Sequence, residues 1–158
     1  MSELKSKREA LIGPLSVGEV LDAAANIVAE RFISSDVYSS ADKVKEYLKF
    51  KLVPYEREVF GVMFLTSQHA LIDFEELFFG TVNMTTVYPR EIVKAALKNN
   101  AAAVILAHNH PSGEPEPSQA DRNITQRIQQ ALSLVDIDVL DHIIVGKESM
   151  SFAERGLI

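Results

Sequence analysis

The feature that most constrains this chain is an apolar run followed at once by residue types that bind metals. Residues 101–107 are all apolar and lie between two asparagines and a segment rich in proline, which predicts a short buried strand. His108 and His110 follow at its C-terminal end. Because side chains two apart on a strand share a face, both imidazoles can reach one ion while Asn109 points away. Asp121 falls in the first turn of the next predicted helix. Two histidines and a carboxylate, with water in the fourth position, are typical of a catalytic zinc site.

The spacing of apolar residues along the rest of the chain predicts an α/β protein. The expected helices are 16–31, a shorter one from 40, one from 89 that stops at 99, and 118–134, and the expected strands are 59–65, 70–79, 101–107, 137–145 and 150–152. A hairpin followed by helix, strand, helix and strand predicts a mixed sheet with helices on both faces. Such a sheet binds ligands at the C-terminal ends of its parallel strands, where His108 and His110 fall.

The length of 158 residues suits one domain with a full core. We expect residues 1–50 to form an N-terminal helical arm or accessory layer on that core, and residues 53–158 to form the metal-binding domain. Ser16-Val17-Gly18-Glu19 has the form of a capping box, which predicts where the first helix begins.

Composition excludes several classes of protein. Hydrophobic residues make up 47% of the chain and charged residues 24%, as in an ordinary globular protein. No apolar run approaches the roughly 18 residues of a membrane span, and no apolar stretch follows the basic residues near the start. We therefore expect no membrane partner and a cytoplasmic location. The absence of cysteine excludes disulfides and thiolate ligands, and the net charge of -6 gives no basic footprint for nucleic acid.

Each candidate residue also has a structural interpretation. His108 and His110 could be strand-end histidines that hydrogen-bond a loop. Ser118 and Asp121 have the spacing of a capping-box variant, a role that does not exclude metal binding by the aspartate. We expect His142, inside an apolar strand, to be structural, with a role beside the metal ligands left open.

A zinc hydrolase also needs a carboxylate that moves protons between the attacking water and the leaving group. The upstream candidates are Glu56, Glu58, Glu75, Glu76 and Glu91. The pattern of residues alone does not choose among them. Glu58 opens an apolar strand, where a carboxylate could be fixed at the end of a sheet, and an exposed strand-edge charge is the alternative.

The spacing of the candidate ligands resembles a known motif. His-x-His, seven residues, Ser, two residues and Asp is the JAMM zinc motif of MPN-domain metalloproteases, and here it runs His108, His110, Ser118, Asp121. The surrounding sequence, over about residues 53–158, resembles the RadC family. The similar segments are 88–94, 107–113, 117–121, 140–143 and 151–156.

This resemblance implies a JAMM/MPN fold, related to the cytidine-deaminase fold, with a three-layer α/β/α arrangement around a mixed sheet. It implies that His108, His110 and Asp121 bind one zinc ion per chain and that Ser118 stabilises the developing oxyanion. The family's glutamate lies in a Glu-x-Phe segment that opens the first long strand. Here that segment is Glu58-Val59-Phe60, so Glu58 becomes the preferred general base.

Two functions of different classes follow. The first is a zinc-dependent hydrolase that cleaves an amide, peptide or isopeptide bond in an unidentified peptide or protein. The alternative is a non-catalytic, metal-stabilised interaction module linked to DNA metabolism or mobile elements.

Full-length RadC proteins carry an N-terminal helix-hairpin-helix module, and no hairpin of that kind is visible before residue 50, so the chain resembles the short RadC-like proteins. Neither this absence nor the net charge supports DNA as a partner. A deaminase is disfavoured because such enzymes take cysteine ligands and carry His-x-Glu. The residues indicate no oligomeric state.

Overall fold

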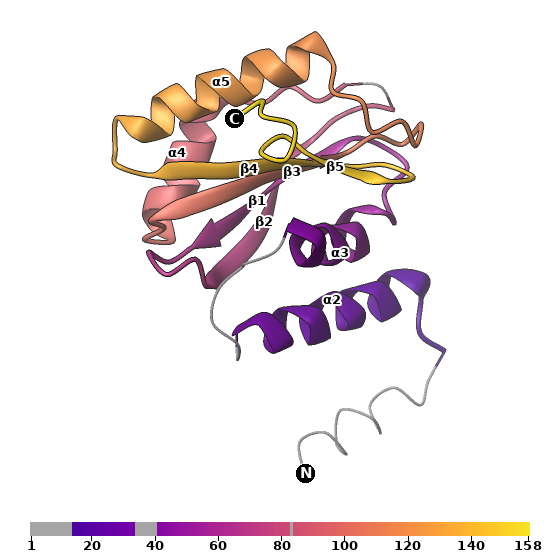
Figure 1. Ribbon diagram of the computed structural model, residues 1–158. Coiled ribbons are helices and arrows are strands. Elements are labelled where there is room, and N and C mark those ends of the chain that lie inside the picture. The colour runs from indigo at the N-terminus through magenta and orange to yellow at the C-terminus, as the bar shows by residue number, and fades with distance from the viewer. Residues whose placement is uncertain (1–13, 34–40, 83) are drawn as a thin grey trace.

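A five-stranded mixed sheet forms the centre of the protein (Figure 1). The computed structural model describes residues 14–33, 41–82 and 84–158. The strand order is β2-β1-β3-β4-β5, in which β3 and β4 are parallel and the other neighbours are antiparallel. The strands are β1 Val59–Leu65, β2 Leu71–Phe79, β3 Ala103–Asn109, β4 Asp138–Val145 and β5 Ser149–Ser151. The mixed sheet predicted from the order of elements is confirmed.

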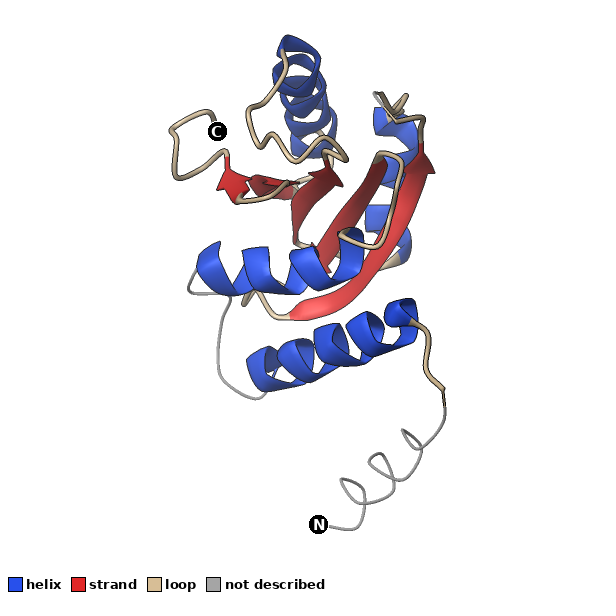
Figure 2. Ribbon diagram, turned by 90° about the vertical axis from the view of Figure 1, so that its right-hand side faces the viewer, coloured by secondary structure: helices blue, strands red, loops and turns tan. Residues whose placement is uncertain are grey.

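Helices cover both faces of this sheet, which gives the expected three-layer α/β/α arrangement (Figures 1 and 2). The helices of the described residues are α2 Val17–Ile33, α3 Ala41–Leu52, α4 Pro89–Lys98 and α5 Gln119–Ser133. α4 and α5 lie on one face, while α3 lies on the other with α2 packed on its outer side. None of the described helices combines the length and the apolar character that crossing a bilayer requires.

Alternate residues of the central strands pack into two separate hydrophobic cores. All seven residues of β1 are buried, and so are all seven of β3. Val59 and Met63 pack with α2 and α3, whereas Phe60 and Val62 pack with α4 and α5. Side chains alternate across a strand, so a strand covered on both faces must be apolar at every position. This explains the continuous apolar runs in the sequence.

Local signals set the helix starts. The backbone N–H of Ser16 donates to Glu19 Oε2 at 2.7 Å and the N–H of Glu19 donates to Ser16 Oγ at 3.3 Å, so the predicted capping box is present. Pro89 occupies the first turn of α4, where its missing N–H leaves no bond unmade. The expected helix start at residue 40 lies outside the described residues.

The predicted end of the strand at residue 107 was wrong, because β3 continues through Asn109. His108 pairs with Phe60 of β1 on one side and with Ile144 of β4 on the other. Strand neighbours on both sides continue the hydrogen-bond ladder whatever the polarity of the side chain. The apolar run therefore ends before the strand itself does.

The turns at the far end of the sheet share an unusual backbone geometry. His69, Asn100 and Asp136 have positive φ angles of 62°, 50° and 57°. They lie in the connections β1–β2, α4–β3 and α5–β4, next to the strand ends Leu65 and Ala103 that pair with each other. The segment that carries His108 lies at the opposite end of these strands.

Candidate metal centre

The candidate ligands lie at the C-terminal end of β3, beside its parallel neighbour. His108 is the penultimate residue of β3 and His110 follows the strand. The N–H of His110 donates to the carbonyl of Val145 at 2.9 Å, which ties this end of the sheet to the end of β4. The sequence predicted this position correctly, since the two imidazoles sit where parallel strands end.

Three candidate ligand side chains lie close together here, one from β3, one from the residue that follows it and one from α5. His108 Nε2 is 2.9 Å from His110 Nε2, and the Asp121 carboxylate places Oδ1 3.3 Å from His108 Nε2 and Oδ2 3.4 Å from His110 Nε2. Zinc bonds of about 2.0–2.1 Å in a tetrahedron separate neighbouring ligand atoms by about 3.3 Å. The spacing and the donor set therefore fit a small tetrahedral metal ion with one position left open. Among the described residues, these three form the group of metal-ligating side chains.

Ser118 and Asp121 form a full capping box at the start of α5. The N–H of Asp121 donates to Ser118 Oγ at 3.0 Å, and the N–H of Ser118 donates to Asp121 Oδ2 at 2.8 Å. The structural interpretation of this pair is thus observed, and it is compatible with the metal interpretation because the carboxylate also faces both histidines. The cap fixes the direction of the Asp121 side chain.

His110 is oriented by the proline-rich loop. Its Nδ1 lies 2.7 Å from the carbonyl oxygen of Glu114, which can only accept, so Nδ1 carries a proton and Nε2 is the nitrogen left to bind a metal ion. Gly113 makes this turn possible with a φ of 88°, and its N–H donates to the carbonyl of His110. The loop therefore turns Nε2 of His110 toward Asp121.

Electrostatics favours a charged carboxylate at Asp121. Burial opposes ionisation, but hydrogen bonds with His108 and His110 outweigh it and hold the pKa of Asp121 well below its usual range. The same contact with Asp121 raises the pKa of His110. A carboxylate that stays ionised beside two imidazoles is the form that can bind a cation.

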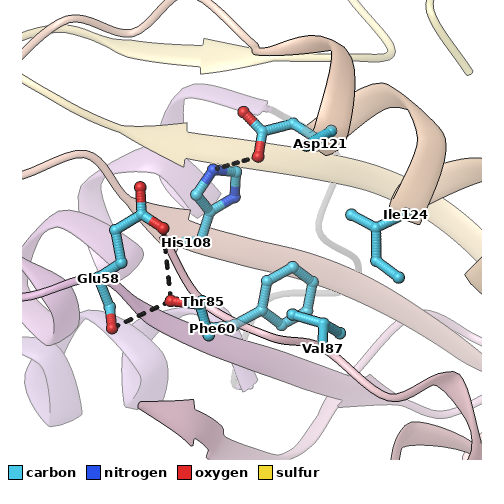
Figure 3. Close-up of a pocket in the computed structure, with 8 residues that line it drawn as sticks. Glu58, Phe60, Thr85, Val87, His108, Asp121 and Ile124 are labelled. Carbon is cyan, nitrogen blue, oxygen red and sulfur yellow. Dashed lines mark hydrogen bonds and ion pairs between the residues drawn. The ribbon is translucent and has the colours of Figure 1, made fainter. Parts of the chain in front are cut away.

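Glu58 lines the same small cavity as His108 and Asp121, about 160 Å³ in volume (Figure 3). Its side chain is half-buried, and burial raises the pKa of Glu58 although the two histidines oppose the rise. The hydroxyl of Thr85 lies 3.4 Å from Glu58 Oε2. Apolar side chains form another wall, made of Phe60, Val87 and Ile124.

The other upstream carboxylates do not line this cavity. Glu56 is exposed. Glu75 accepts from Asn99, Glu76 accepts from Tyr55, and Glu91 pairs with Lys94. Of the five glutamates that the sequence left open, the fold therefore brings Glu58 to the candidate ligands.

Asn109 holds the segment that carries Glu58, a role that sequence reasoning missed. Its Oδ1 accepts from the N–H of Val59 at 2.7 Å, and its Nδ2 donates to the carbonyl of Arg57 at 3.0 Å. Glu58 lies between these two anchored residues, and its own N–H donates to the carbonyl of Thr81 at 2.8 Å. The side chain does point away from the imidazoles, as predicted, but toward the chain that supplies the carboxylate.

His142 is fully buried in β4, as expected of a structural residue, and it also contacts a candidate ligand. Its Nε2 lies 2.8 Å from His108 Nδ1, and its Nδ1 lies 2.6 Å from Thr125 Oγ1. Burial and the neighbouring His108 lower the pKa of His142 well below its usual range, so the ring is neutral. The sequence left this role open for His142 and gave no signal for Thr125.

The chain is similar to known proteins of one family. Residues 38–157 match the family described as RadC-like JAB domain. Two proteins of Vibrio cholerae serotype O1, both named UPF0758 protein, are 61% and 56% identical over 137 and 138 residues. These matches cover 87% of this chain in each case, and 87% and 88% of the two relatives. A UPF0758 protein of Pseudoalteromonas translucida is 58% identical over 140 residues, which are 88% of this chain but 62% of that longer protein.

Proposed function

Because the chain belongs to the RadC-like JAB domain family and groups His108, His110 and Asp121 at the end of its sheet, we propose that it is a zinc-dependent hydrolase of amide, peptide or isopeptide bonds. The observation that carries the proposal is the presence of Glu58 in the same cavity as two of these candidate ligands, His108 and Asp121. A metal site of three protein ligands with an adjacent carboxylate is the arrangement that metal-assisted hydrolysis requires.

In this proposal each side chain has one task. His108, His110 and Asp121 hold the ion, which when bound would lower the pKa of a coordinated water to about 7 and polarise the substrate carbonyl. Glu58 accepts a proton from the attacking water and delivers it to the leaving nitrogen. The raised pKa of Glu58 suits this exchange, because a base with a pKa nearer to neutrality both takes up and releases a proton readily.

Ser118 is proposed to stabilise the carbonyl oxygen as it becomes negative. Its Oγ already accepts from the N–H of Asp121, so the position of the hydroxyl is fixed and its own hydrogen remains to be donated. A donor fixed in this way costs little reorganisation when charge develops on the substrate.

The apolar wall of the cavity favours a substrate with an apolar group beside the scissile bond. Phe60, Val87 and Ile124 face the cavity across from Glu58 (Figure 3). A small apolar wall with a few polar groups at one side is typical of sites that orient a substrate by its side chain. Peptide or protein substrates therefore fit this proposal best.

The proposal is tested by measuring zinc content and peptide cleavage in matched variants. We expect about one zinc per chain in the wild type and in Glu58→Gln, and none in the double variant His108→Ala/His110→Ala. Cleavage of a peptide library should fall by about 10²–10⁴-fold in Glu58→Gln, the usual contribution of a general base. Glu56→Gln is the matched control, because Glu56 is two residues away and exposed, and it should cleave like the wild type.

Equal cleavage by the wild type and Glu58→Gln would refute the proposed base. Zinc binding without cleavage of any peptide would refute the hydrolase and favour the non-catalytic, metal-stabilised module instead.

A further inference from the structure

The hydroxyl of Thr125 sits between two acceptor-capable groups, and its single proton determines the hydrogen bonds around it. Thr125 Oγ1 lies 2.6 Å from the backbone carbonyl of Asp121 and 2.6 Å from His142 Nδ1. The carbonyl oxygen can only accept, so Thr125 donates its proton to Asp121. Thr125 Oγ1 must then accept from His142, which places a proton on Nδ1 of His142.

The hydrogen bond between His142 and His108 places the proton of His108 in the same way. In a neutral imidazole with a proton on Nδ1, Nε2 carries a lone pair. His142 Nε2 lies 2.8 Å from His108 Nδ1, so His108 donates there and carries its own proton on Nδ1. Nε2 of His108, which faces His110 and Asp121, is then the nitrogen that can offer its lone pair to a metal ion.

Packing holds the two rings in these positions. The Phe152 ring stacks on His142 with centroids 4.7 Å apart and planes 27° apart. Phe60 stacks on His108 with planes 10° apart and meets His142 edge-on at 5.5 Å. Phe152 is itself fixed, since its N–H donates to the carbonyl of His142 at 3.0 Å. Rotation of either imidazole would require these phenylalanines to move.

We propose that Thr125 and His142 are positioning residues, which fix the tautomer of His108 so that its Nε2 can bind the metal ion. The inference rests on the metal site of the proposed function. The relay starts at the backbone of Asp121 and ends at His108, so one chain of hydrogen bonds through β4 aligns a ligand from α5 with a ligand from β3. Groups that orient a ligating histidine in this way raise metal affinity.

The first measurement is made on the metal-free protein. The sequence has four histidines, so each imidazole can be assigned in a ¹⁵N–¹H spectrum that distinguishes protonated from unprotonated ring nitrogens. We expect His108 and His142 to carry their protons on Nδ1. A His108 Nδ1 that carries no proton in the folded, metal-free wild type would overturn the proposal.

The second measurement is the affinity for zinc ions in competition with a chromophoric chelator. Thr125→Val replaces the hydroxyl by a methyl group of similar shape, and we expect zinc to bind about 10–100-fold more weakly, with the proton on His108 Nδ1 now partly lost. Thr125→Ser keeps the hydroxyl and should restore both the affinity and the tautomer. Thr66→Val removes a hydroxyl in the β1–β2 turn and is the matched control, expected to match the wild type in both.

The outcomes separate this inference from the proposed function. If Thr125→Val is folded and keeps wild-type zinc affinity and the wild-type tautomer of His108, Thr125 is only structural and the inference fails. If zinc affinity and the tautomer of His108 change together but neither the wild type nor any variant cleaves a peptide, the positioning role of Thr125 and His142 is supported and the proposed hydrolase activity is refuted. If the wild type binds no zinc, both fail.

Discussion

At the scale of single residues, Gly80 shows how closely the chain is packed around the candidate base. The N–H of Gly80 donates to the carbonyl of Glu58 at 2.8 Å, directly after the end of β2. A Cβ at this position would overlap the carbonyl oxygen of Met84 and the hydroxyl of Thr85. Glycine is therefore required by space here, since any side chain would push the loop that holds Glu58 away from the cavity.

We predict that Gly80→Ala lowers the free energy of unfolding by about 1–3 kcal/mol, the usual cost of overpacking, and lowers peptide cleavage. Zinc affinity should remain, because the candidate ligands make their hydrogen bonds and ion pairs with one another, with His142, with Glu114 and with Ser118. Denaturant unfolding, zinc titration and cleavage assays measure the three effects. Gly18→Ala is the control: Gly18 lies in α2, where a Cβ would make only an ordinary contact with Ser16 Oγ at 3.9 Å, so alanine should raise stability by up to about 1 kcal/mol. Unchanged stability and cleavage in Gly80→Ala would contradict the prediction.

At the scale of elements, Tyr55 joins the segment between α3 and β1 to the edge strand β2. Its hydroxyl donates to Glu76 Oε2 at 2.5 Å, and its ring meets Phe79 edge-on. Burial, followed by the hydrogen bond and negative charge of Glu76, raises the pKa of Tyr55 from 10 to about 12. This contact holds the chain just ahead of Glu58. It also makes the stability of the fold depend on pH in the alkaline range.

We predict that Tyr55→Phe costs about 1 kcal/mol of stability at neutral pH, the usual net value of one hydrogen bond. In the wild type the folded state keeps the phenol proton more tightly than the unfolded state. The added stability is therefore complete below pH 10 and is lost as the pH rises through about 12. Urea unfolding at about pH 8 and about pH 11 should show a smaller difference between the two proteins at the higher pH. A difference that grows with pH would contradict this assignment.

The elements that sequence reasoning predicted well are those specified by neighbours in the chain. β1 was predicted from end to end by its apolar run, and α4 by Pro89 and the asparagines that follow it. The segment with the candidate ligands was found because the motif keeps His108 and Asp121 at a fixed spacing. The rest depends on pairing across the sheet. Asn109 contacts Val59 although the two are 50 residues apart in the sequence, and Thr125 contacts His142 although they are 17 residues apart. At these separations no local sequence pattern indicates a contact.

At the scale of the whole molecule, the candidate site joins separate parts of the fold. His108 comes from β3 and Asp121 from α5, which meet at one end of the sheet. An ion held by both would link these two elements, and it would bind the folded chain but not the unfolded one. Binding should therefore stabilise the protein as a unit.

We predict that zinc at 100 times its dissociation constant adds about 2.7 kcal/mol to the free energy of unfolding. For a chain of this length that corresponds to a rise of about 5–10 °C in Tm. Calorimetry with zinc, and again after excess chelator, measures the rise and its reversal. The double variant His108→Ala/His110→Ala should show no response. A Tm that is insensitive to zinc in the wild type would contradict a site formed by both elements.

The three left-handed turns at the far end of the sheet offer a suitable site for attaching the protein to a surface or a label. His69 lies in one of them, beside the exposed Gln68 and at the opposite end of β1 from Glu58. The chain has no cysteine of its own, so Gln68→Cys would introduce a unique thiol. The protein can be tethered to a surface or labelled with a dye through that thiol while the candidate metal centre faces away from the attachment point.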